Sequence, residues 1–121
     1  MHDELTEAIF ELGSFIRYVA YGEGQTISTR ERGGLDAASD ATSDRFEELL
    51  VNPTLLTLAR QRGELDCGGL RHVVVAYGNF NQLVIPTRAG HVSVALERDA
   101  DPFAVAHAVA GLLERHGLAE G

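Results

Sequence analysis

Residues 71–97 most constrain the fold, because three short β-rich runs follow one another there with only turns between them. The runs His72–Tyr77 and Phe80–Ile85 are separated by Gly78-Asn79, a two-residue loop of the kind that closes β-hairpins. In the third run, His91–Glu97, every second side chain is a large apolar one, so one face of this strand is expected to be buried. The stretch therefore predicts a three-stranded antiparallel meander.

The N-terminal residues predict a short helix followed by a β-hairpin. Leu5, Ile9 and Leu12 recur at the spacing that places side chains on one face of a helix. Residues 15–21 show instead the alternation and the β-branched and aromatic content of a strand. A glycine-containing turn then leads into residues 25–30, which we interpret as the returning strand.

The middle of the chain predicts a loop and then a helix. Residues 31–43 are mostly turn formers, and we interpret them as a surface loop. Asp44 with Glu47 three positions later resembles a capping box, so a helix is expected to begin there. The buried face of this helix is expected to consist of Phe46, Leu49 and Leu50.

Asn52-Pro53 is expected to interrupt this helix, because proline lacks an amide proton and disfavours helical backbone in the residue before it. Asn52 would then cap a second helical segment that ends near Gly63. The apolar residues of this segment are Leu55, Leu56, Leu58 and Ala59. The region is therefore predicted to be one bent helix or two short ones.

A final helix completes the order of elements. Asp101 and Pro102 are interpreted as its cap and first-turn proline. The apolar residues that follow at helical spacing are Val105, Val109, Leu112 and Leu113. The predicted fold class is α+β, a five-stranded antiparallel sheet with helices packed on it, in the order α-β-β-α-β-β-β-α. With 121 residues, the chain is expected to form a single domain over 1–121.

Composition excludes several classes of function. All ten basic residues are arginines, so the chain supplies no Schiff-base lysine, P-loop lysine or lysine general base. The net charge of −8 argues against binding to the phosphate backbone of nucleic acids. The lone cysteine cannot form an internal disulfide, and neither a secretory signal nor an apolar run of membrane length is evident. We therefore expect a cytoplasmic protein that is not inserted in a membrane.

No group of residues forms a recognisable catalytic centre. Cys67 is the first candidate nucleophile, with His72 five residues later, but the neighbouring Asp66 would disfavour a thiolate. The other interpretation of Cys67 is a small buried or half-buried residue at a turn. The adjacent carboxylates Glu47-Glu48 are interpreted as a solvated helix face. We expect no enzyme and no catalytic residue, with a hydrolase that uses Cys67 kept as an alternative.

The histidines do not predict a metal site. His107 and His116 are nine residues apart on the last helix, about 900° of rotation, and so lie on opposite faces. His72 and His91 are expected on the first and third strands of the meander, roughly 9.5 Å apart, which is too far for one zinc ion without further ligands. All are expected to face solvent or to be half-buried. We predict neither a metal nor another cofactor.

The order of elements is similar to that of the roadblock family of dynein light chains and their bacterial relatives. Leu12–Ala20 resembles the first passage from helix to strand in this family, and Tyr77–Pro86 with Gly90–Val94 resembles its central meander. The resemblance covers nearly the whole chain and rests on topology and hydrophobic pattern. It implies a roadblock/profilin-like sheet between helices, a homodimer, and a scaffold or regulator role. Bacterial members often act on Ras-like small GTPases, and the family has no catalytic motif to carry over.

In the roadblock order of strands, the run from His72 to Tyr77 would lie at one edge of the sheet. An open edge exposes unpaired amides and carbonyls, which favour pairing with another strand, and this run contains no lysine, proline or inward charge to prevent it. We therefore predict that this strand pairs with its symmetry mate. The predicted interface residues are His72, Val73, Val74, Val75, Ala76 and Tyr77. The alternative is that a helix or loop of the same chain covers the edge.

A second class of function fits the same sequence. A five-stranded sheet under helices also describes sensory folds that hold small ligands. The aromatic side chains that could line such a pocket are Tyr18, Tyr21, Tyr77 and Phe80, although aromatic residues in a core are the other interpretation.

Overall fold

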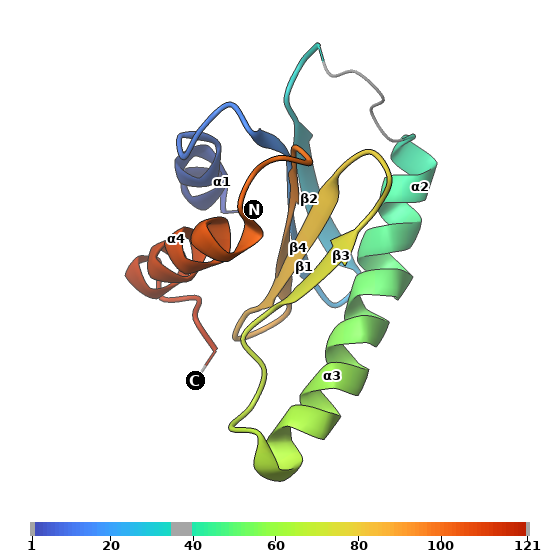
Figure 1. Cartoon of the computed structure of the whole chain (residues 1–121), viewed down its shortest axis with the longest axis vertical. Helices are drawn as coiled ribbons and strands as arrows, with labels where there is room; N and C mark the ends of the chain where they lie inside the picture. The colour runs from blue at the N-terminus through green and yellow to red at the C-terminus, as the bar shows by residue number, and fades with distance from the viewer. Residues whose placement is uncertain (1, 35–39, 121) are drawn as a thin grey trace.

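One antiparallel sheet lies between two layers of helices in the computed structural model, which describes residues 2–34 and 40–120 (Figure 1). The strands are β1 (Ile16–Glu23), β2 (Thr26–Glu31), β3 (Val73–Ala76), β4 (Asn81–Pro86) and β5 (His91–Leu96). Their spatial order is β2-β1-β5-β4-β3, so β2 and β3 are the edges. The α+β class and the predicted order of elements are confirmed.

The helices form two layers of different character. One face of the sheet is covered by α1 (Asp3–Phe10) and α4 (Pro102–Arg115), and the other by a long helix (Figure 1). This long helix runs without interruption through α2 (Ala41–Phe46), the π-helical turn η1 (Glu47–Val51) and α3 (Asn52–Asp66).

The main apolar core lies between the sheet and the helices α1 and α4. Its fully buried members include Ile9 from α1, Val94 from β5 and Val109 from α4. The predicted last helix is confirmed, since the Asp101 side chain accepts a hydrogen bond from the Phe103 amide at 3.0 Å and the expected apolar residues face this core.

The meander is also confirmed. The Tyr77 amide donates to the Phe80 carbonyl at 2.9 Å, which closes the two-residue turn at Gly78-Asn79. From this turn the β3–β4 register continues to the pair Val73 and Val84. The chain then turns again, and β4 pairs with β5 along its whole length.

The start of the long helix differs from its prediction. The cap is Asp40, whose side chain accepts from the Thr42 amide at 2.7 Å, and not Asp44. The expected loop over 31–43 is also shorter at both ends, because Glu31 still belongs to β2 and α2 begins at Ala41. Residues 35–39 of that loop lie outside the described residues.

The predicted interruption at Asn52-Pro53 is wrong. The helix widens instead, and the backbone amide of Asn52 donates to the carbonyl of Glu47, five residues earlier. A π-helical turn of this kind accommodates Pro53, which has no amide of its own to continue the ordinary bonding pattern. The helix also passes the expected end at Gly63, where a Cβ atom would lie 2.6 Å from the Gly69 carbonyl oxygen. Glycine at this position therefore lets the following turn pack against the helix.

Candidate interaction surface

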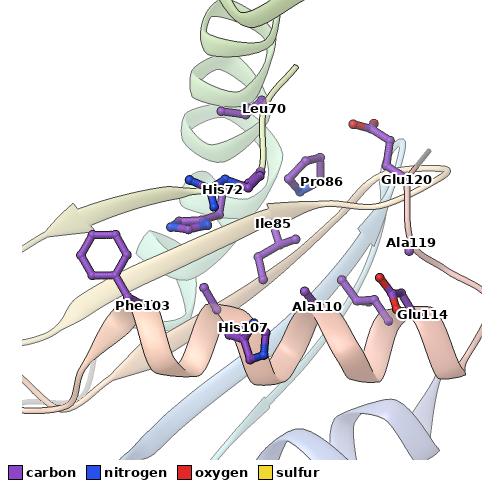
Figure 2. Close-up of a pocket in the computed structure, with 13 residues that line it drawn as sticks. Leu70, His72, Ile85, Pro86, Phe103, His107, Ala110, Glu114, Ala119 and Glu120 are labelled. Carbon is purple, nitrogen blue, oxygen red and sulfur yellow. The ribbon is translucent and has the colours of Figure 1, made fainter. Parts of the chain in front are cut away.

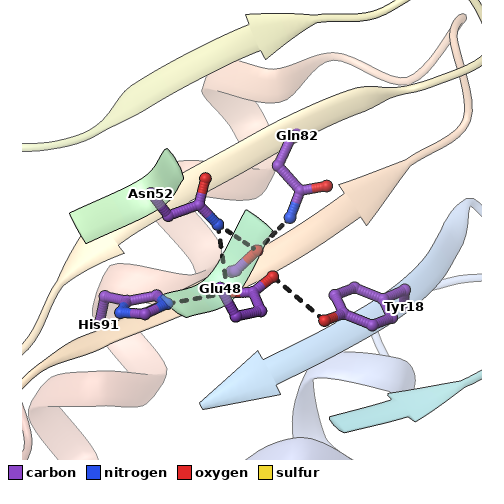
Figure 3. Close-up of polar contacts among 6 residues, drawn as sticks. Tyr18, Glu48, Asn52, Gln82 and His91 are labelled. Atoms are coloured by element: carbon purple, nitrogen blue, oxygen red, sulfur yellow. Dashed lines mark hydrogen bonds and ion pairs between the residues drawn. The ribbon is translucent and has the colours of Figure 1, made fainter. Parts of the chain in front are cut away.

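A buried polar network attaches the long helix to the sheet (Figure 3). Glu48 of η1 is 1% exposed, and its Oε1 lies 2.8 Å from Nε2 of His91 on β5. The Tyr18 hydroxyl donates to Glu48 Oε2 at 3.1 Å, and the side-chain amide of Asn52 donates to Glu48 Oε1 at 3.1 Å. The same side-chain amide also donates to the Ser93 hydroxyl, at 3.3 Å. The Gln82 amide donates to the same hydroxyl.

This network overturns three predictions, two about the helix and one about His91 of β5. Glu48 is not part of a solvated face, and His91, which is 6% exposed, is neither solvent-facing nor half-buried. The buried positions of the helix are Glu48, Asn52, Leu56 and Gly63, and of the expected apolar residues Leu56 alone is fully buried. Hydrogen-bond partners on the strands make this burial of polar groups possible.

Four large apolar residues of the helix point outward as a consequence. The exposed fractions are 57% for Phe46, 54% for Leu50, 61% for Leu58 and 79% for Leu65. The π-helical turn η1 contains one inserted residue, which is left out when the rotation about the helix axis is counted. The rotation is then about 1100° from Phe46 to Leu58 and about 700° from Leu58 to Leu65. The three side chains therefore lie within about 20° of one another around the axis. We call the four exposed residues Phe46, Leu50, Leu58 and Leu65 the outer stripe. A stripe of large apolar side chains on a surface helix is typical of a surface that another protein covers.

The edge strand β3 lies beside this helix (Figure 1). The bond from Tyr77 to Phe80 marks a hydrogen-bonded pair, and such pairs alternate along an antiparallel ladder. The amides and carbonyls of Val75 and Val73 therefore point to β4, whereas those of Val74 and Ala76 point to the open edge. Among the described strands, β3 pairs only with β4.

The other edge, β2, is built differently. It carries the exposed charged residues Arg30 and Glu31, of the kind that discourage edge-to-edge pairing. The middle of β3 is three half-buried valines without a charge. Of the two edges, β3 is therefore the one suited to accept another strand.

A pocket of about 380 Å³ lies where the β3–β4 hairpin meets the long helix. Its walls include the aromatic rings of Phe46, Tyr77 and Phe80 and the carboxyl groups of Asp44 and Glu47. The Tyr77 hydroxyl donates to Glu47 Oε2 at 2.6 Å, and the rings of Tyr77 and Phe80 lie 5.3 Å apart. We call this cavity the hairpin pocket.

The comparisons with known proteins identify the fold. No protein-family model and no curated protein matches the chain. The structure is similar to that of a Roadblock/LC7 domain from Streptomyces avermitilis, with a TM-score of 0.69, 19% identity, and coverage of 93% of this chain and 92% of that one. It is also similar to the gliding protein MglB from Thermus thermophilus, with a TM-score of 0.62, 12% identity, and coverage of 94% and 91%.

The chain has a roadblock-type fold. This confirms the resemblance drawn from Leu12–Ala20 and from the meander.

The candidate nucleophile Cys67 is exposed at the end of α3, so the expectation that it is buried or half-buried is wrong. The Cys67 thiol lies 3.3 Å from Asp66 Oδ1 and 3.2 Å from Nη1 of Arg62, a basic neighbour that the sequence prediction did not include. The His72 ring lies against Phe103 of α4, with ring centroids 6.0 Å apart, and no hydrogen bond joins it to Cys67 within residues 2–34 and 40–120. The structure therefore does not bring the two candidate residues Cys67 and His72 together as a pair.

Two further properties concern metals and membranes. Within the described ranges, no three His, Cys, Asp or Glu side chains gather in a way that could hold a metal ion. None of the helices described here is long and apolar enough to span a membrane.

The aromatic residues expected to line one ligand pocket lie apart in the roadblock-type fold. Tyr18 is buried under the long helix, and Tyr21 is buried in the core with α1 and α4. Tyr77 and Phe80 line the hairpin pocket, which contains neither Tyr18 nor Tyr21.

A larger cavity, of about 490 Å³, lies between α4, the start of β3, the end of β4 and the C-terminal residues (Figure 2). Ile85 and Pro86 line it from β4, and Ala110 lines it from α4. His72 stands at its β3 side, and burial together with the charge of Arg71 lowers the pKa of this histidine.

The three tyrosines give a prediction for alkaline pH. Burial and the Glu48 carboxylate raise the pKa of Tyr18, burial raises the pKa of Tyr21, and burial with the hydrogen bond to Glu47 raises the pKa of Tyr77 to about 12. In the folded protein, tyrosinate absorbance should therefore develop above the ordinary value near 10. In denaturant, all three tyrosines should titrate at that ordinary value.

The same shifts predict how stability depends on pH. The folded protein retains phenolic protons that the unfolded chain loses, so the free energy of unfolding should fall as the pH rises from about 10 towards 12. Tyr77→Phe should reduce this dependence. A folded-state titration that coincides with the unfolded one would contradict the described environments of the tyrosines.

Proposed function

We propose that this protein is a non-enzymatic, homodimeric regulatory module that acts by binding other proteins. The observation that carries the proposal is the polarity of the long helix. It buries the polar residues Glu48 and Asn52 and exposes the apolar outer stripe beside an open edge strand. An isolated chain would leave this surface in water, whereas a second copy would cover it.

The proposed dimer interface is the predicted strand from His72 to Tyr77, paired antiparallel with its symmetry mate. The outward amides and carbonyls of Val74 and Ala76 supply the hydrogen bonds of this pairing. A two-fold axis perpendicular to the sheet keeps both long helices on the same face, so their outer stripes lie near one another. Strand pairing and helix packing then contribute to a single interface.

The partner class that the roadblock resemblance supports is a Ras-like small GTPase. A direct test is a pull-down from native lysate with the immobilised dimer, once with excess GDP and once with a non-hydrolysable GTP analogue. The proposal expects a small GTPase to be retained more strongly with one nucleotide. Recovery of no protein partner in either condition would contradict the regulatory role.

A second candidate function is a sensor of small molecules, because the cavity beside α4 has the volume of a ligand site. A ligand present at about 100 times its dissociation constant would stabilise the fold by about 2.7 kcal/mol. A thermal-shift screen should then find compounds whose effect is weakened in Ala110→Phe, a variant that narrows the cavity. If no compound shifts the melting temperature, the sensor function is wrong.

A further inference from the structure

Arg71, just before β3, is an exposed cation without a partner of its own. It forms neither an ion pair nor a hydrogen bond within residues 2–34 and 40–120. Six residues further along the chain, Tyr77 begins the wall of the hairpin pocket, which contains the carboxyl groups of Asp44 and Glu47. A basic side chain and an acidic, aromatic pocket thus lie at opposite ends of the same strand.

These two features can meet on one face of the sheet. Tyr77 faces the long helix, because its hydroxyl bonds Glu47. His72 faces the opposite layer, where its ring meets Phe103. Counted by the alternation of side chains along an extended chain, position 71 falls on the same face as Tyr77, although it precedes the first residue of β3. In the single chain Arg71 lines the cavity beside α4, near His72, so the pairing proposed below requires its side chain to turn towards the long helix.

The proposed pairing of two β3 strands places these ends together. In a pair of antiparallel strands, directly opposite residues have their side chains on the same side of the sheet. A two-fold axis between the strands must therefore lie between a residue and the same residue of the other copy, for example between the two Val74 residues or between the two Val75 residues. With the axis at Val74, Arg71 lies opposite Tyr77 of the other copy. With the axis at Val75, Arg71 lies opposite Asn79, which also lines the hairpin pocket.

We propose that Arg71 of each subunit enters the hairpin pocket of the other, where it pairs with Glu47 and lies against the ring of Tyr77. The occupant of the pocket is thus a second copy of this chain, and the inference rests on the proposed homodimer. Facing residues in a non-hydrogen-bonded pair have Cα atoms about 4.5 Å apart, well within the reach of an arginine side chain. The two-fold axis creates this contact twice.

The chemistry of the pocket suits a guanidinium group. Arginine pairs with carboxylates and also lies on aromatic rings, and the pocket offers both kinds of group. Burial raises the pKa of the Glu47 carboxyl, which shows that its charge is poorly solvated in the single chain. A cation beside this group favours its ionised form.

The test is a charge exchange between two variants of the full chain, with the dimer dissociation constant measured by analytical ultracentrifugation. Arg71→Glu and Glu47→Arg should each weaken their own homodimer by about tenfold or more, because like charges then meet twice. An equimolar mixture of the two variants should form a heterodimer as stable as the wild-type dimer, because both contacts again join opposite charges. Arg115→Glu and Glu114→Arg, two exposed positions on α4, are the matched controls and should leave the dimer unchanged.

The outcomes separate this inference from the function on which it rests. A dimeric wild type whose stability does not change in Arg71→Glu would overturn the Arg71 contact and leave the homodimer in place. Weakened single variants that do not recover on mixing would also overturn it, since the contact must join two subunits. A wild type that is monomeric at every concentration would overturn the proposed homodimer itself.

Discussion

Val74→Pro is expected to convert the protein from a dimer to a monomer without unfolding it. The Val74 amide points to the open edge, so proline there removes a hydrogen bond to the second copy and none to β4. Its ring also stands where the second strand must approach. The dimer dissociation constant should rise by about 100-fold or more, or about 2.7 kcal/mol, as measured by light scattering at several concentrations.

Two neighbouring variants make this result specific. Val74→Ala also removes the valine side chain but keeps the amide, and it should weaken the dimer far less than proline does. Val75→Pro removes an amide that bonds β4, so it should destabilise the fold itself. If Val74→Pro leaves the dimer intact, β3 is not the strand through which the subunits pair.

The largest expected loss of stability is that of Glu48→Ala. This change removes the acceptor for Tyr18 and Asn52 and the partner of His91, all of them buried. Breaking a buried charged network from one side costs about 3–5 kcal/mol, because the remaining polar groups stay buried without a partner. Urea denaturation at a fixed protein concentration should show this loss in the free energy of unfolding.

Glu64→Ala is the control for this experiment. Glu64 is an exposed glutamate on the same helix, and its replacement should change the free energy of unfolding by less than about 0.5 kcal/mol. Equal effects of the two substitutions would contradict the central position given to Glu48. If both effects are small, the helix is held on the sheet by other contacts.

The sequence predicts the sheet and the last helix well, because there the local pattern and the tertiary environment agree. The valines of β5 alternate as a strand requires, and Asp101 caps a helix whose apolar face is buried as expected. The edge position of β3 followed from the roadblock order of strands and is the observed one.

The long helix could not be predicted in the same way. An apolar stripe normally marks the buried face of a helix, but here that stripe is exposed and Glu48 is buried. The partners that permit this burial, Tyr18 and His91, lie 30 and 43 residues away in the sequence. Such long-range hydrogen bonds leave no local periodicity.

The hairpin pocket has the same origin. The bond between Glu47 and Tyr77 spans 30 residues and forms only because the long helix crosses beside the meander. Sequence spacing alone placed Glu47 in a cap and Tyr77 in a strand, and it could not bring the two together. The acidic and aromatic residues at the start of the long helix and the aromatic residues beside the β3–β4 turn were nevertheless visible in the sequence as a signal for such a pocket.

The most direct test of the account is the mass of the wild-type protein in solution, measured by light scattering over a wide range of concentrations. We expect a mass of twice 13.1 kDa that persists on dilution to low micromolar protein. A mass of 13.1 kDa at every concentration would contradict it, because the open edge of β3 and the outer stripe would then be surfaces that no second copy covers.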